Sequence, residues 1–108
     1  MKIAFDLDDT VFTQGSPDNK YRDSVPKPEM IEMVNALYDE GHEIYFFSAR
    51  HFQHYKYTTE VLKEAGAKYH GLVLNKISVH LFVDDRGFHW TDGKKEDLLK
   101  RIEGMKND

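Results

Sequence analysis

Two pairs of acidic residues stand directly after short apolar runs, and they are the residues of this chain best suited to chemistry. Asp6 and Asp8 close the first apolar run, and Asp84 and Asp85 close a later one. Carboxylates beside a buried strand are costly unless a positive group meets them. Because carboxylate oxygens are ligands that Mg²⁺ prefers, the two pairs predict a divalent metal site.

A hydroxyl and an amine follow two further apolar runs. Ser48 comes after the run that ends at Phe47, and Lys76 comes shortly after Leu74. Ligands of open parallel sheets bind beyond the carboxyl ends of the strands, so these groups are expected to share one crevice with the acidic pairs. The set suits phosphoryl transfer: one Asp can attack phosphorus, a second can move a proton, and a hydroxyl and a lysine can hold the transferring oxygens.

The elements that must position these groups follow from hydrophobic periodicity. Strands are predicted at Lys2 to Phe5, Glu43 to Phe47, Leu72 to Leu74 and His80 to Val83, and helices at Pro28 to Glu40, about Tyr55 to Ala65 and about Lys94 to Glu103. Near-continuous apolar strands that alternate with amphipathic helices indicate an α/β fold, with a parallel sheet covered on both faces.

Two stretches depart from this alternation of strands and helices. The link from Lys76 to Val79 is too short for a covering helix, which is unusual between parallel strands. Either the two strands are joined by an unusually short loop without a helix, or one of the two flanking strand predictions is wrong. Residues 11–27 are rich in turn-forming residues and are predicted to form a surface flap rather than core.

The order of the chemical groups resembles the four motifs of the haloacid dehalogenase (HAD) superfamily. The first motif is similar to Asp6-Leu7-Asp8-Asp9-Thr10, the second to Ser48 after Tyr45-Phe46-Phe47, the third to Lys76, and the fourth to Phe82-Val83-Asp84-Asp85. The resemblance spans nearly the whole chain and implies a three-layer Rossmann-like fold, with a short parallel sheet flanked by helices.

The resemblance also implies the chemical roles of the first-motif residues. Asp6 would be the nucleophile that forms an aspartyl-phosphate, and it would also bind Mg²⁺. Asp8 would be the general acid/base, with its backbone carbonyl on the ion. An Asp at that second position is typical of the phosphatases of the superfamily rather than of its dehalogenases.

The remaining motif residues would bind phosphate and metal. Ser48 and Ala49 would contact the phosphoryl group, and Lys76 would neutralise it and orient the nucleophile. Asp85 would be the direct metal ligand and Asp84 its supporting partner, although these two roles could be reversed.

Two arginines closely follow motif residues. Arg50 and Arg86 could bind a second phosphate or a carboxylate of the substrate. They could equally pair with the nearby acids to balance charge, and the sequence favours neither role.

The resemblance implies a member without a cap domain. Residues 11–27 are too short for a helical cap, and no insert follows Ser48. The site would then be open to a large or extended substrate, or a neighbouring copy in a homo-oligomer could supply a lid.

Length, charge and hydrophobicity limit the number of domains, the partners and the location that can be expected. The 108 residues predict one domain, 1–108, and the net charge of −4 without a basic block disfavours nucleic acid as a partner. No apolar stretch is long enough to cross a membrane, and the N-terminus lacks a signal-peptide pattern, so a cytoplasmic protein is expected.

Two functions compete. The leading hypothesis is a Mg²⁺-dependent phosphomonoester hydrolase that works through Asp6 on a sugar phosphate, a nucleotide or another phosphorylated metabolite. The alternative is a non-catalytic phosphate-binding or phosphoacceptor module with a HAD-like fold. Asp8 argues against pure binding, which needs no acid/base.

Overall fold

The chain divides into two compact units, Met1–Ser78 and Val79–Asp108. The computed structural model describes residues 1–106. The first unit contains all the strands and most of the predicted site residues. The prediction of a single domain over residues 1–108 stays a prediction.

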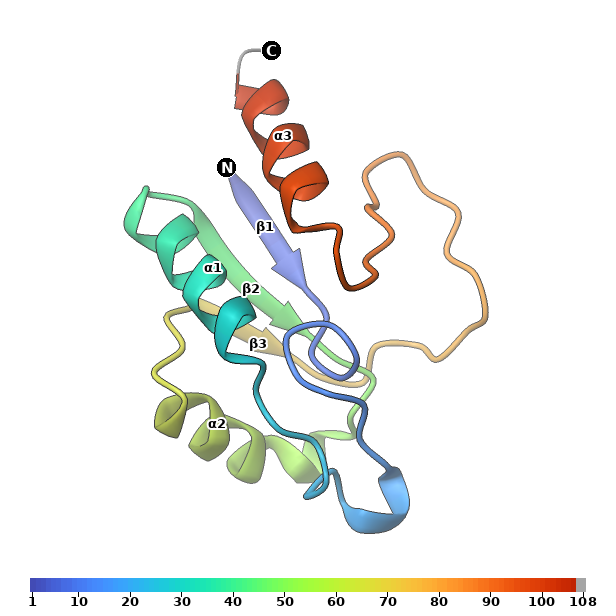
Figure 1. The fold of residues 1–108 in the computed structure, drawn as a ribbon. Coiled ribbons are helices and arrows are strands. Elements are labelled where there is room, and N and C mark those ends of the chain that lie inside the picture. The colour runs from blue at the N-terminus through green and yellow to red at the C-terminus, as the bar shows by residue number, and fades with distance from the viewer. Residues whose placement is uncertain (107–108) are drawn as a thin grey trace. The chain divides into compact units, whose positions relative to one another are not determined.

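A three-stranded parallel sheet forms the centre of the first unit (Figure 1). Its strands lie in chain order and are β1 (Lys2–Phe5), β2 (Glu43–Phe47) and β3 (Gly71–Val73). Ile3 pairs with Ile44, and Phe46 lies between Phe5 and Leu72. The predictions for β1 and β2 are confirmed, and β3 lies slightly earlier in the chain than predicted.

Two α-helices connect the strands. They are α1 (Pro28–Asp39) and α2 (Tyr55–Glu64), and the short 3₁₀ segments η1 (Pro17–Asn19) and η2 (Phe52–His54) precede them. Pro28 occupies the start of α1, where its missing N–H costs nothing. Gly41 has a φ of 98° just after α1, a conformation that glycine adopts without strain.

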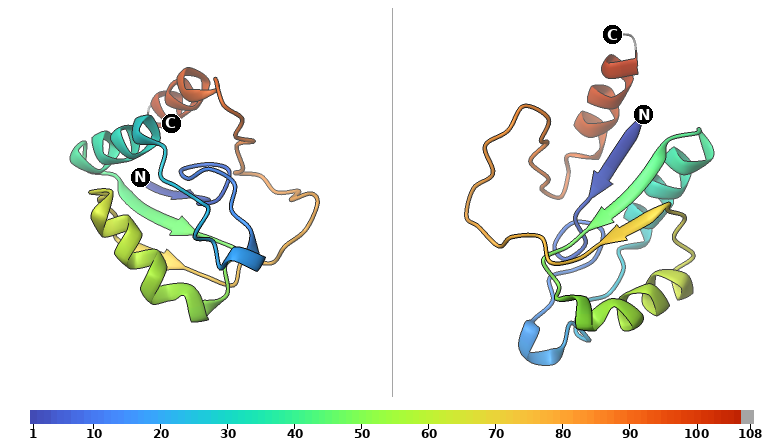
Figure 2. Two further views of the ribbon diagram at one scale, coloured as in Figure 1. Left: turned by 60° about the horizontal axis from the view of Figure 1, so that its bottom comes forward. Right: turned by 180° about the vertical axis from the view of Figure 1, so that it is seen from behind.

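Both helices lie on the same face of the sheet (Figure 2). When strands follow one another in chain order, right-handed crossovers place their helices on one side. The burial of β2 agrees, since Ile44 and Phe46 are fully buried whereas Tyr45 and Phe47 are half-buried. The parallel α/β prediction is confirmed, but residues 1–78 contain no second helical layer of the predicted three-layer fold.

The core of the first unit lies between the sheet and these helices. The apolar face of α1 packs into it, because Met30, Ile31, Met33, Val34 and Leu37 are buried and Tyr38 is half-buried. The buried apolar side chains of this unit are Phe5, Leu7, Val11, Phe12, Met30, Ile31, Met33, Val34, Leu37, Ile44, Phe46 and Leu62.

The first residues of the flap (residues 11–27) belong to this core. Val11 and Phe12 are both 0% exposed, so the prediction that the whole stretch lies outside the core is wrong there. The carbonyl oxygen of Leu7 accepts the N–H groups of Thr10, Val11 and Phe12 at 2.9 to 3.1 Å. This tight turn folds the chain back into the unit before the flap leaves it.

The second unit contains α3 (Lys95–Lys106), which confirms a C-terminal helix and extends it beyond the prediction. The predicted strand from His80 to Val83 is wrong, because these residues have no strand structure. Leu81 and Val83 are 75% and 87% exposed. The link after Lys76 is shorter than parallel crossovers require, and an apolar run alone does not make a strand.

Within residues 1–106, no helix combines the length and the apolar character that a membrane span requires.

Candidate functional site

The site starts from an ion pair at the carboxyl end of the sheet. Asp6 follows the last residue of β1, and its Oδ2 atom lies 3.4 Å from Nζ of Lys76. The Lys76 side chain is only 14% exposed and its ammonium lies 4.1 Å from the centre of the Phe47 ring. Asp6 is 39% exposed, and its Oδ1 accepts the N–H of Leu7 at 2.8 Å. A fixed positive charge therefore faces a carboxylate that a ligand can reach.

Ser48 joins the predicted second and third motifs. Its N–H donates to the carbonyl oxygen of Val73, and its own carbonyl accepts the N–H of Lys76, each at 2.9 Å. These bonds continue the pairing of β2 with β3 and bring Ser48 beside Lys76. The Ser48 hydroxyl is buried and accepts the backbone N–H of Arg50 at 3.1 Å, which leaves its proton available to an acceptor. Ala49 lies exposed between them.

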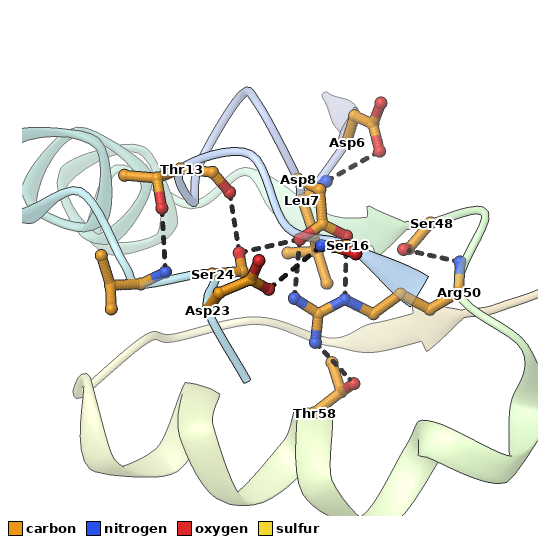
Figure 3. A network of polar contacts seen from close by, with 11 residues as sticks. Asp6, Leu7, Asp8, Thr13, Ser16, Asp23, Ser24, Ser48, Arg50 and Thr58 are labelled. Atoms are coloured by element: carbon orange, nitrogen blue, oxygen red, sulfur yellow. Dashed lines mark hydrogen bonds and ion pairs between the residues drawn. The ribbon is translucent and has the colours of Figure 1, made fainter. Parts of the chain in front are cut away.

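Asp8 and Arg50 form a two-pronged ion pair (Figure 3). Nε of Arg50 donates to Oδ2 of Asp8 at 2.8 Å, and Nη2 donates to Oδ1 at 2.7 Å. The Arg50 side chain is 1% exposed and that of Asp8 is 20% exposed. Of the two roles that the sequence left open for Arg50, this geometry supports charge pairing.

Arg50 is fixed on its other sides as well. Its Nη1 donates to the hydroxyl of Thr58 in α2 at 3.0 Å. The guanidinium lies 4.6 Å from the ring centre of Tyr21 and 5.5 Å from that of Phe12, both in the flap. One buried cation thus connects Asp8, the flap and α2.

The flap closes over the Asp8 carboxylate. Oγ of Ser24 lies 2.8 Å from Oδ1 of Asp8 and 2.7 Å from the carbonyl oxygen of Thr13. A Cβ atom at Gly15 would lie 3.2 Å from Oδ1 of Asp8, so the flap backbone approaches this oxygen closely. Burial, and then the Asp8 carboxylate, raise the pKa of the Tyr21 phenol above its ordinary value of 10.0.

The second acidic pair lies in the second unit. Oδ1 of Asp84 accepts the N–H groups of Arg86 and Gly87 at 2.8 and 2.6 Å. These bonds, with that from Arg86 the larger cause, lower the pKa of Asp84 below its ordinary value of 3.8. Asp85 is 85% exposed, and its Oδ2 lies 3.7 Å from Nε of Arg86. Asp84 therefore holds a local turn, and Arg86 pairs weakly with Asp85.

Apart from Ala49, the predicted residues of the first unit thus form one connected set. Hydrogen bonds and ion pairs link Asp6 to Lys76, Lys76 to Ser48, Ser48 to Arg50 and Arg50 to Asp8. The residues Asp84, Asp85 and Arg86 belong to the other unit.

One carboxylate of this set has the donor chemistry that a hard cation requires. Within residues 1–106, no cluster of three or more His, Cys, Asp or Glu side chains is arranged to hold a metal ion. The exposed carboxylate of Asp6 is an oxygen donor of the kind that Mg²⁺ accepts. Because the Asp8 side chain is held by Arg50 and Ser24, Asp8 would offer its backbone carbonyl, as the sequence resemblance implies.

Three residues of the site were not identified from the sequence: Thr58, Ser24 and Gly15. Thr58 carried a sequence signal, because it is a polar residue one turn before the apolar Leu62 in α2. The structure buries both side chains completely. The other two stand in a turn-rich stretch whose composition explains serine and glycine equally well without a site.

Comparison with known proteins finds a solved structure with a similar fold. The chain matches no protein-family model, and no curated protein is significantly similar to it. The crystal structure of a structural genomics target from Vibrio cholerae is similar, with a TM-score of 0.67 and 21% sequence identity. The match covers 94% of this chain and 98% of that one. At this identity, the likeness shows a shared fold.

Proposed function

We propose that this protein is a Mg²⁺-dependent phosphomonoester hydrolase of HAD type, with Asp6 as its nucleophile. The observation that carries the proposal is the Asp6–Lys76 ion pair, held beside Ser48 where parallel strands end. The order of the four sequence motifs and the parallel α/β fold support it. The Rossmann-like HAD assignment is part of the same proposal.

The residues of the first unit suit the two half-reactions. A carboxylate oxygen of Asp6 attacks phosphorus while the bond from phosphorus to the ester oxygen breaks, and Asp8 gives a proton to the leaving alcohol. Water then attacks the aspartyl-phosphate, Asp8 accepts its proton, and inorganic phosphate leaves. Lys76 and the Ser48 hydroxyl offset the charge on the phosphoryl oxygens.

In the first unit, the metal would be held by Asp6 and the backbone carbonyl of Asp8, and Mg²⁺ there would neutralise charge on the transferring phosphoryl group. That Asp84 or Asp85 also binds the ion stays a prediction. The exposed carboxylate of Asp85 supports it as the direct ligand, because Oδ1 of Asp84 is occupied by its own turn.

The chemistry of the site defines a substrate class but no single substrate. Lys76 and Ser48 suit a phosphate monoester, and within residues 1–106 no cap-sized insert separates the strands. A small phosphorylated metabolite or the end of an extended phosphorylated chain would fit this proposal. A lid from a second copy and a cytoplasmic location stay predictions.

One observation favours a second candidate, a phosphoacceptor module. The Asp8 carboxylate is already engaged by Arg50 and Ser24. If these contacts prevented Asp8 from activating water, the phosphorylated Asp6 would persist. The rate of dephosphorylation separates the two candidates, since an enzyme turns over and a switch accumulates the phosphorylated form.

Hydrolysis of 4-nitrophenyl phosphate, with Mg²⁺ and with EDTA, tests the proposal. We expect turnover only with Mg²⁺, no turnover in Asp6→Asn, and a loss of about 100-fold in Lys76→Met. Asp39→Asn is the matched control, because it makes the same change at a residue that pairs with Lys68 on the surface. Full activity in purified Asp6→Asn would contradict the assignment of the nucleophile.

A further inference from the structure

We infer that Arg50, Thr58 and the flap residue Ser24 are positioning residues, which hold Asp8 so that its Oδ2 atom exchanges the proton with the leaving group. This inference rests on the proposed function, because it assigns the oxygen of Asp8 through which that reaction runs. It concerns contacts inside the first unit alone.

The donors around Asp8 are unequally distributed. Among the contacts within residues 1–106, Oδ1 receives Nη2 of Arg50 and also contacts the hydroxyl of Ser24, whereas Oδ2 receives Nε of Arg50 alone. A carboxylate has about four acceptor positions, two on each oxygen. The remaining position is therefore on Oδ2, and a proton placed there displaces no donor.

The guanidinium cannot follow Asp8 if Asp8 turns. Nη1 of Arg50 is tied to Thr58, its backbone N–H is tied to Ser48, and its side chain is 1% exposed. A planar guanidinium offers its donors in a rigid fork, so fixing one arm also fixes the two that face Asp8. Thr58 therefore acts on Asp8 through Arg50 without touching it.

The flap holds the opposite side of the carboxylate. A Cβ atom at Gly15 would lie 2.8 Å from Cβ of Ser24, 3.2 Å from Oδ1 of Asp8 and 3.3 Å from Cδ1 of Tyr21. Side chains do not pack that closely, so residue 15 must be glycine for the flap to reach Oδ1. The flap thereby covers Oδ1 and leaves proton transfer to Oδ2.

The test compares two substrates that need the proton to different degrees. An alkyl phosphate has a poor leaving group that must be protonated, whereas 4-nitrophenolate leaves without help. The ratio of kcat/KM for the alkyl ester to that for the aryl ester therefore reports the position of the proton donor. Partial loss of folded enzyme lowers both values equally and leaves the ratio unchanged.

Thr58→Val removes the acceptor for Nη1 with little change in volume. We expect the ratio to fall about tenfold, the effect of one lost buried hydrogen bond, and to recover in Thr58→Ser. Thr59→Val is the matched control, because the hydroxyl of Thr59 bonds only to the carbonyl of Lys56 in its own helix. Ser24→Ala tests the same inference from the flap side and should also lower the ratio.

The outcomes separate this inference from the proposed function. An unchanged ratio in Ser24→Ala and in Thr58→Val, with wild-type enzyme active and Asp6→Asn inactive, would overturn the positioning roles alone. Equal absence of hydrolysis in wild type and Asp6→Asn would overturn the proposed function, and this inference with it.

Discussion

Arg50 is the residue around which the chemistry of the first unit is organised. A fully buried guanidinium is costly unless every donor that leaves water meets an acceptor. Here each guanidinium nitrogen meets an acceptor, Asp8 after β1 for Nε and Nη2 and Thr58 in α2 for Nη1. Contacts from two separate segments fix the guanidinium, and the fixed guanidinium keeps the Asp8 carboxylate in one orientation.

The stability of this ion pair can be measured by a double-mutant cycle. Arg50→Met leaves the Asp8 carboxylate 80% enclosed without its partner, since Asp8 is 20% exposed. We expect the free energy of unfolding in urea to fall by about 3 kcal/mol. In Asp8→Asn/Arg50→Met, the loss should be smaller than the sum of the two single losses.

An exposed ion pair provides the control for this cycle. Lys68 and Asp39 lie 2.8 Å apart with side chains that are 48% and 60% exposed. Lys68→Met should cost less than about 1 kcal/mol because solvent screens such pairs. Equal costs for Arg50→Met and Lys68→Met would contradict a structural role for the buried pair.

Single residues of the site were predictable only in part from the sequence. Asp6, Ser48 and Lys76 could be placed together, because the ends of neighbouring parallel strands converge. The partner of Arg50 could not be chosen, since Asp8 is 42 positions away and either a substrate or an acid would satisfy a guanidinium. The hydrogen bond to Thr58 depends on the side chain directions of α2, which periodicity alone does not give.

At the scale of an element, the flap is held by its own small network. Oδ1 of Asp23 accepts the N–H of Ser16 at 3.0 Å, and Oδ2 accepts the side-chain amide of Asn19 at 3.2 Å. Lys20 and Tyr21 have φ values of 54° and 63°, which are unfavourable for side chains larger than glycine. The contacts of Asp23 help to offset this strain.

This network predicts how the flap responds to acid. The Ser16 N–H, and then the Asn19 amide, lower the pKa of Asp23 below its ordinary value of 3.8. A lowered carboxyl pKa means that its stabilisation is complete above the ordinary value and is lost as the pH falls through the lowered one. The flap should therefore keep its structure down to about pH 4 and loosen below that.

The amide resonance of Ser16 in an NMR pH titration measures this response. It should shift with the titration of Asp23 in wild-type protein and show no such step in Asp23→Asn. A matched control is Asp18→Asn, which makes the same change in η1, a few residues away in the flap. A step that persists in Asp23→Asn would contradict the assignment.

The elements themselves were mostly predictable. β1 and β2 are each apolar after a charged first residue, and α1 carries both a proline at its start and a glycine after its end. The run from His80 to Val83 has the same apolar character but no strand structure. Strand formation depends on a pairing partner as well as on local sequence, and the partner is set by tertiary structure.

At the scale of the whole molecule, binding of Mg²⁺ should change the stability of the protein. Asp6, which we propose as a ligand, belongs to the unit Met1–Ser78. An ion that binds only the folded protein stabilises it by mass action, by about 2.7 kcal/mol at 100 times its dissociation constant. We therefore expect Mg²⁺ to raise the midpoint of thermal unfolding, and EDTA to reverse the rise.

Variants in each unit show which carboxylates bind the ion. Asp6→Asn should remove most of the Mg²⁺-dependent rise, because it deletes an anionic ligand, and Asp85→Asn tests whether the second unit supplies another. Asp97→Asn is the control in the second unit, where Asp97 pairs with Lys94 on the surface. A wild-type response in Asp85→Asn would show that the ion does not use this carboxylate.

The central claim is that Asp6 carries the phosphoryl group, and chemical trapping tests it most directly. The Asp8→Asn variant is mixed with Mg²⁺ and 4-nitrophenyl phosphate, quenched in acid and treated with borohydride, which reduces an aspartyl-phosphate to homoserine. Peptide mass spectrometry should then find homoserine at position 6 and nowhere else. Homoserine at another position, a phosphorylated Ser48, or turnover without any modified residue would contradict the account.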